Sequence, residues 1–239
     1  MNRNELHINC DLGEGSKNES QIMNYIQACN IACGGHFGDS NSVYQTLSKA
    51  VDLGIEVGAH PSYPDFENFG RVSINLDKEA FFSSMRQQLD LYFDQLSKLH
   101  TKNNHIKAHG ALYNDLCVNE ELCIWFLEVT KSYPHKTLYT PFNGRLADLA
   151  KESNTPVSFE AFIDRNYNRE GRLISRALPH AEKDSLDAVY DQLESIRLKQ
   201  EVPCTDGTFV PMKAATFCIH GDHPLALERL HFIEKRYSK

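Results

Sequence analysis

Short apolar runs in this sequence end in side chains that can move protons or hold charge. Asp11 and Glu14 follow the first run, His60 follows the third, and Lys107 and His109 close the fourth. A carboxylate can act as a general base, an imidazole can exchange a proton near neutral pH, and an ammonium can hold an anion. These residue types together predict acid–base chemistry on a substrate that is, or becomes, negatively charged.

The same placement recurs after other runs. Further candidates are His36 after the second run, Glu160 and Asp164 in and after the sixth, and His220 and Asp222 after the last. A single Asp or His after a strand often serves only as a helix cap or turn residue, and Asp39 and Asp222 fit that role. Repetition in six of seven runs exceeds what caps require, because a buried charge is costly unless function retains it. We therefore predict that these side chains meet around one pocket.

Strand-like and helix-like segments alternate along the chain and must position these residues. The predicted strands span 6–10, 29–33, 55–59, 105–108, 137–140, 157–162 and 214–219, and the predicted helices 41–53, 77–99, 119–131, 144–152, 184–199 and 224–239. In the second helix Phe81, Met85 and Leu89 belong to one stripe with three- and four-residue spacing. The alternation predicts an α/β fold, a single-domain β/α barrel of about seven parallel strands over residues 1–239, with an open doubly wound sheet as the alternative. Because ligands bind at the carboxyl ends of parallel strands, the polar residues should converge there.

Glycine-rich turns accompany several candidates. Gly34 lies in the run 33–39 and Gly110 follows His109, and such glycines let a backbone approach a carboxylate or phosphate closely. Segments 165–183 and 200–213 are rich in Pro, Gly and charge and are predicted as loops over the same face. The sequence holds no Walker-type loop, and Asn18 stands where a dinucleotide loop would need its third glycine. If ATP is used, it must bind through another geometry or on a partner.

Composition limits the classes of function. The net charge of −7 without a basic stripe argues against nucleic acid binding. Polar residues Met1 to Glu5 open the chain and no apolar run reaches the length of a membrane span, so we expect a cytoplasmic protein. The seven scattered cysteines form no C-x-x-C pair, which is typical of reduced thiols and excludes a zinc ribbon.

Blocks spread in order over nearly the whole chain resemble the LamB/YcsF lactam-utilisation family. They are INCDLGE at 8–14, ACNIACG at 28–34, GAHPSYPD at 58–65, FGR at 69–71, KAHGALYN at 107–114, EAFIDR at 160–165 and IHGD at 219–222. Two blocks depart from the family pattern: residues 33–39 read CGGHFGD in place of CGFHAGD, and Ala108 replaces the usual proline. The functional polar positions are kept.

The resemblance implies a fold and an activity. It implies a seven-stranded β/α barrel related to glycosidases and sugar deacetylases, and a hydrolase component of the kind that serves as the A subunit of 5-oxoprolinase. Such an enzyme, working with two other subunits, opens 5-oxo-L-proline to L-glutamate while hydrolysing ATP. On this basis we expect Asp11 or Glu14 as the base, with His36, His60 and His109 donating protons or polarising the carbonyl group. The remaining roles are Lys107 and Arg71 as anion holders, Glu160, Asp164 and His220 as orienting groups, and Gly34, Gly110, Tyr113, Asn114, Arg165 and Asp222 as further substrate- or phosphate-binding residues.

Two other functions stay open. Asp11, His36 and His60 offer oxygen and nitrogen ligands for zinc or manganese, as in a stand-alone metal-dependent amidohydrolase or deacetylase. Activity without ATP, lost with a chelator, would identify that enzyme. A non-catalytic regulatory chain that binds an amino-acid-like ligand would instead show binding without turnover.

Overall fold

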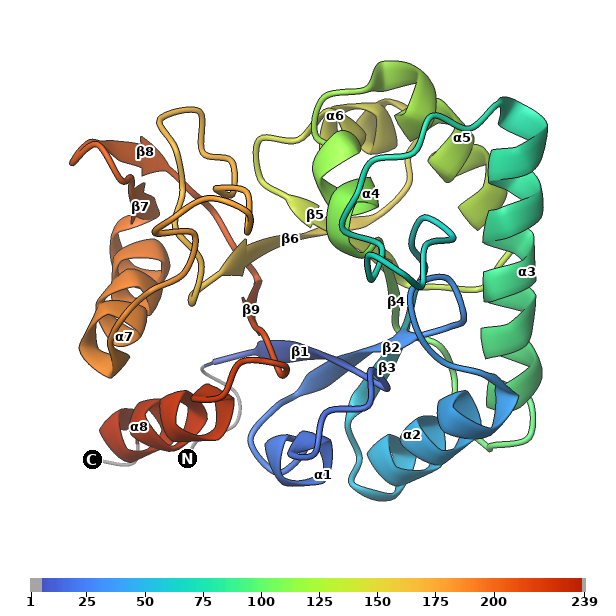
Figure 1. The fold of residues 1–239 in the computed structure, drawn as a ribbon, viewed down its shortest axis with the longest axis horizontal. Helices are drawn as coiled ribbons and strands as arrows, with labels where there is room; N and C mark the ends of the chain where they lie inside the picture. The colour runs from blue at the N-terminus through green and yellow to red at the C-terminus, as the bar shows by residue number, and fades with distance from the viewer. Residues whose placement is uncertain (1–5, 238–239) are drawn as a thin grey trace.

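A closed barrel of seven parallel strands forms the centre of the molecule (Figure 1). The computed structural model describes residues 6–237, so the polar N-terminal residues 1–5 and the end of the predicted last helix, 238–239, lie outside it. The strands are β1 (Ile8–Leu12), β2 (Ala28–Ala32), β3 (Glu56–His60), β4 (His105–Lys107), β5 (Thr137–Pro141), β6 (Val157–Phe162) and β9 (Thr216–Ile219). Strand β9 pairs with both β6 and β1 and closes the barrel, which confirms the predicted barrel over the open sheet.

Helices surround the barrel on its outside (Figure 1). They are α1 (Glu19–Ile22), α2 (Ser40–Asp52), α3 (Lys78–Leu96), α4 (Gly110–Asp115), α5 (Glu120–Thr130), α6 (Arg145–Glu152), α7 (Leu186–Glu194), which continues as a π-helical turn over Ser195–Lys199, and α8 (Ala226–Tyr237). Asp39 caps α2 by accepting hydrogen bonds from the backbone of Asn41 and Ser42, so the cap predicted for Asp39 is confirmed. The short helices α1 and α4 were not predicted, because four or six residues show no clear periodicity.

Alternate residues of the strands point into the barrel, and many of these are polar. Lys107 on β4 contacts Asp11 on β1, two strands that are not neighbours, so the contact crosses the interior. Below it, the Asn30 side chain donates to Asn9 at 2.8 Å and lies 2.6 Å from His105 Nε2. These side chains bond to one another across the interior, although His105 Nδ1 has no hydrogen-bond partner among the described residues. A ladder of polar side chains thus leads up to the carboxyl ends of the strands.

The long segment between β6 and β9 leaves the barrel. Residues 165–183 are irregular, as predicted, with isolated bridges between Arg165 and Glu182 and between Tyr167 and Leu173. Residues 200–213, predicted as a loop, instead contain an antiparallel hairpin of β7 (Glu201–Pro203) and β8 (Phe209–Pro211). A tight turn at Gly207, with φ of 85°, joins these strands. The hairpin escaped prediction because each strand has three residues and ends in proline.

The cysteines and helices bear on the compositional predictions. All seven cysteines are free thiols, and all except Cys117 are buried, where they act as small apolar side chains. Within residues 6–237, no helix has both the length and the apolar character needed to cross a lipid bilayer.

Candidate active site

A cavity of about 670 Å³ opens at the carboxyl ends of the barrel strands. Thirteen of the predicted site residues line it: Asp11, Glu14, His60, Arg71, Lys107, His109, Gly110, Tyr113, Asn114, Glu160, Arg165, His220 and Asp222. Three others lie behind its wall. His36 is stacked on His109, Asp164 lies behind His220, and the Gly34 N–H donates to the carbonyl of Phe37 within its own turn. The structure therefore brings the predicted polar residues to one place, with Gly34 shaping a turn outside the cavity.

Lys107 stands at the floor of the cavity between two carboxylates. Its Nζ lies 2.9 Å from Asp11 Oδ1 and 3.0 Å from Glu160 Oε1, and all three side chains are buried. Burial alone would lower the pKa of Lys107, but Asp11 and Glu160 hold it well above its ordinary value. Burial would raise the pKa of Asp11, and His60 and Lys107 hold it well below its usual range. Both groups are therefore charged at neutral pH.

Glu14 approaches the same floor from the turn after β1. The Glu19 carboxylate fixes this turn by accepting hydrogen bonds from the N–H groups of Gly13, Glu14 and Ser16. Glu14 Oε1 lies 3.0 Å from His36 Nε2. Burial, together with repulsion from Asp11, raises the pKa of Glu14 to about 8. A carboxyl group whose pKa is raised in this way can exchange a proton near neutral pH.

Three histidines pack together beside Glu14. The rings of His36 and His109 are stacked with centroids 3.6 Å apart, and His60 meets His109 edge to face. Burial lowers the pKa of His36 to about 3, and burial with the neighbouring His36 and His60 lowers the pKa of His109 well below its ordinary value. A neutral imidazole has a free lone pair with which it can bind a metal ion.

Two groups of side chains have the geometry to hold a metal ion among the residues described. One is Asp11, His60 and His109, the other is Glu14, His36 and His109, and in each the ligand atoms lie within 4.8 Å of one another. The trio predicted from sequence was Asp11, His36 and His60. The structure corrects it, because His36 lies behind the ring of His109 and only His109 reaches the other two.

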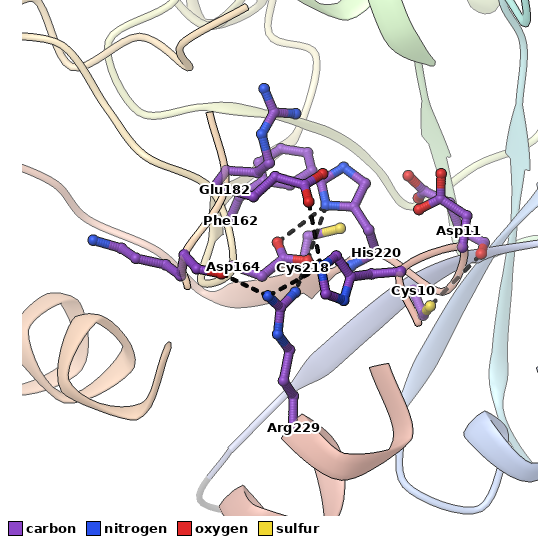
Figure 2. A network of polar contacts seen from close by, with 12 residues as sticks. Cys10, Asp11, Phe162, Asp164, Glu182, Cys218, His220 and Arg229 are labelled. Atoms are coloured by element: carbon purple, nitrogen blue, oxygen red, sulfur yellow. Dashed lines mark hydrogen bonds and ion pairs between the residues drawn. The ribbon is translucent and has the colours of Figure 1, made fainter. Parts of the chain in front are cut away.

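A second charged cluster lies at the ends of β6 and β9 (Figure 2). Asp164 accepts a hydrogen bond from the His220 backbone at 2.9 Å and lies 3.0 Å from His220 Nδ1. Arg229 of α8 is buried, with Nη1 3.5 Å from Asp164 and Nη2 donating to the carbonyl of Lys183. Burial would raise the pKa of Asp164, but His220 and Arg229 hold it below its ordinary value. Asp164 is thus an anion that fixes the His220 ring, which stacks on Phe162.

Arginines gather at the rim of the cavity. Arg71 Nη2 lies 2.7 Å and Arg176 Nη1 3.0 Å from the same Asp222 oxygen. The cap predicted as the simple role for Asp222 is therefore wrong, since its carboxylate bridges two guanidinium groups instead. Arg165 donates to the backbone carbonyls of Ala181 and Ile174, which fastens its loop. Arg172 and Arg176 also line the cavity and were not singled out from the sequence, because they lie in a segment without periodicity.

Gly110 has a packing role next to His109. Its φ is 58°, and a Cβ at this position would lie 2.4 Å from the carbonyl oxygen of Gly70. The close approach brings the residue before Gly70, Phe69, to His109, whose Nε2 lies 3.0 Å from the Phe69 carbonyl oxygen. Tyr113 follows on α4, where burial and the nearby Glu160 raise the pKa of its phenol. Gly110 therefore allows the close approach that orients His109, and the anion-binding amide suggested by the sequence stays a prediction.

The fold and the cavity together define a parallel β/α barrel with a buried carboxylate, histidine and lysine centre at its strand ends. Residues 6–239 match the LamB/YcsF family, and the chain belongs to that family.

Relatives of known name support this assignment. The chain is 34% identical to the 5-oxoprolinase A subunit of Thermococcus sibiricus, over 98% of this chain and 94% of the relative. It is 36% identical to the 5-oxoprolinase A subunit of Acinetobacter baumannii, over 93% and 90% respectively. The crystal structure of a lactam utilization protein from Thermus thermophilus superposes with a TM-score of 0.87 at 27% identity, covering 98% of this chain and 96% of that one.

Proposed function

We propose that this chain is the A subunit of an ATP-dependent 5-oxoprolinase and opens 5-oxo-L-proline to L-glutamate together with two partner subunits. The observation that carries the proposal is the buried Lys107, with Asp11 and Glu160 at 2.9 and 3.0 Å, beneath a cavity rimmed by arginines. The names of the relatives supply the substrate. The cavity of about 670 Å³ falls within the usual range for small ligands, roughly 300–1,000 Å³.

The chemistry explains why ATP is needed. A lactam is a resonance-stabilised amide, so water attacks it slowly. Transfer of the terminal phosphoryl group of ATP to the lactam oxygen makes the ring carbon electrophilic. Water then adds to that carbon, and cleavage of the C–N bond with proton transfer to nitrogen leaves an acyl phosphate. A second water releases phosphate and completes L-glutamate.

The residues divide this work by position. Glu14, once ionised, takes the proton of the attacking water, and its pKa of about 8 makes it a stronger base than an ordinary carboxylate. Lys107 supplies positive charge where oxygen becomes anionic, and Arg71 and Arg176 hold the phosphoryl group at the rim. His220 delivers a proton to the leaving nitrogen, since Asp164 occupies its Nδ1 and its Nε2 makes no hydrogen bond to any residue from 6 to 237.

The nucleotide and the partners complete the proposal. The sequence holds no Walker-type loop, so we place the adenine-binding part of the ATP site on a partner, with the phosphoryl group reaching this cavity. Seven free cysteines favour the cytoplasm as the place of the reaction.

Reconstitution tests this function. The purified chain is mixed with candidate partner subunits from its own organism, and glutamate release from 5-oxoproline is measured with and without ATP. We expect release only with ATP, and at least about a 100-fold loss in the variant His220→Gln, because removing a general acid typically lowers the rate 10²- to 10⁴-fold. His180→Gln, which changes an exposed loop histidine, is the matched control and should retain full activity. Release by the isolated chain without ATP would favour the stand-alone amidohydrolase instead.

A further inference from the structure

His60 and His109 face each other through two ring nitrogens that both carry lone pairs. His60 Nδ1 lies 2.8 Å from the Lys107 carbonyl oxygen, which can only accept, so the proton of a neutral His60 is on Nδ1. His109 Nε2 lies 3.0 Å from the Phe69 carbonyl oxygen, which places its proton on Nε2. The remaining nitrogens, His60 Nε2 and His109 Nδ1, are 3.0 Å apart. Two lone pairs at this distance repel each other unless a cation or a proton lies between them.

A carboxylate lies beside each of these two nitrogens. Asp11 Oδ2 lies 3.4 Å from His60 Nε2, and Glu14 Oε1 lies 3.5 Å from His109 Nδ1. In a tetrahedral site with metal–ligand distances of about 2.0–2.1 Å, neighbouring ligand atoms are about 3.3–3.4 Å apart. The three separations of 3.0, 3.4 and 3.5 Å surround this value. The ligand atoms of Asp11, His60 and His109 all lie within 4.8 Å of one another and can share one ion, whereas Glu14 belongs with His36 and His109 to the neighbouring group.

The groups behind these donors hold them as metal ligands are held. Histidine ligands usually donate their second nitrogen to a carbonyl or carboxylate, and His60 and His109 both do so. Asp11 uses its other oxygen, Oδ1, to accept from Asn30 at 2.7 Å and from Lys107 at 2.9 Å, which turns Oδ2 toward the histidines. Phe69 takes a left-handed φ of 56° while presenting its carbonyl to His109.

We propose that Asp11, His60 and His109 bind one divalent transition-metal ion, for which Zn²⁺ best matches two imidazole nitrogens and one carboxylate oxygen, with a fourth position open to the cavity. His36 is a positioning residue, since its ring stacks on that of His109 with centroids 3.6 Å apart. When bound, such an ion polarises a carbonyl or phosphoryl oxygen and acidifies water. The site lies within the cavity of the proposed function, but its existence does not depend on which reaction takes place there.

Direct binding measurements test the site. The full chain is stripped with a chelator, and Zn²⁺ or Co²⁺ alone is added while heat release, the visible spectrum of Co²⁺ and thermal unfolding are recorded. We expect one ion per chain, Co²⁺ absorption bands typical of four ligands, and a higher Tm. Asp11→Asn and His109→Gln should each weaken binding at least about 100-fold, since loss of a ligand exceeds the 10- to 100-fold effect of supporting groups. His180→Gln, on an exposed loop, should bind as the wild type does.

The outcomes separate this site from the proposed reaction. If the folded wild-type chain, checked by circular dichroism, binds Zn²⁺ and Co²⁺ no more tightly than His109→Gln, the proposal is wrong, and the two imidazoles share a proton. Tight binding without ATP-dependent glutamate release in the reconstituted complex would overturn the proposed function and leave the metal site standing. Full glutamate release by metal-free protein that binds no ion would overturn the metal site and leave the proposed function standing.

Discussion

Replacing Lys107 with methionine should reveal how strongly the barrel interior depends on one ammonium group. Methionine keeps an unbranched apolar side chain but leaves Asp11 and Glu160, both buried, without the cation that lies 2.9 and 3.0 Å from them. Removing one partner of a buried ion pair typically costs about 3–5 kcal/mol. We expect the free energy of unfolding to fall by about that amount at pH 7.

The loss should depend on pH in a defined direction. In the wild type the pKa of Asp11 lies below its unfolded value, so this carboxylate adds stability above about pH 4 that is lost as the pH falls through its folded pKa. In Lys107→Met burial without the ammonium raises the folded pKa, so the folded state retains protons that the unfolded chain releases. Stability of the variant then falls as the pH rises. The difference between the two proteins should therefore widen from about pH 4 to pH 7.

Urea denaturation followed by the fluorescence of Trp125, the single tryptophan, measures this difference between about pH 4 and pH 7. Lys78→Met is the matched control, because its ion pair with Glu128 at 3.0 Å is half exposed and should contribute less than about 1 kcal/mol. Adding Glu160→Gln to Lys107→Met should restore part of the loss. A Lys107→Met protein as stable as the wild type at every pH would refute the view that the ammonium makes these buried carboxylates tolerable.

Three further changes probe the groups around this centre. Gly110→Ala should destabilise the fold by more than Gly54→Ala in urea titrations, because both have left-handed φ but only the former meets a backbone oxygen at 2.4 Å; equal losses would contradict the close approach. Arg229→Met should lower kcat more than it raises KM, and it should shift the acidic limb of the pH–rate profile to higher pH, because Asp164 loses the positive charge that lowers its pKa. Arg229→Lys, which keeps a positive charge, should restore part of the activity. In metal-free protein, Glu14→Gln should gain stability over the wild type as the pH rises from about 4.5 to 8, the interval over which only the unfolded Glu14 is ionised, and parallel unfolding curves would argue against the raised pKa.

The convergence of the polar residues could be predicted because the topology of the barrel determines where the strand ends lie. Once strands are parallel and joined by helices, their carboxyl ends must meet at one face. The ends of the runs at Asp11, His60 and Lys107 therefore define a common cavity without any knowledge of distances. The strand boundaries differ by one or two residues, so Asp11 lies within β1 and His60 within β3.

The pairing of the histidines was not predictable. It depends on how the turn containing His36 and the loop around Phe69 fold over His109. The spacing of these residues along the sequence does not determine how the two loops fold. The polar interior did leave a signal, because polar residues two apart, such as Asn9 with Asp11, share one face of a strand.

Arg229 left no such signal in the sequence. An arginine in an amphipathic helix is ordinarily predicted to face the solvent. Only the structure shows that Arg229 is buried against Asp164. The hairpin turn at Asp206 and Gly207 was a recognisable motif, but the flanking prolines hid its short strands.

The excursion, the segment of chain between β6 and β9, is held together largely by hydrogen bonds within its own backbone. Asn166 and Ala181 are hydrogen bonded to each other, as are Tyr167 and Thr205, and the same excursion supplies Arg172 and Arg176 to the cavity rim. The barrel and part of the rim of its cavity are consequently formed by different stretches of chain. The shape and charge of the entrance therefore depend in part on this one stretch, whereas the seven strands hold the floor of the cavity.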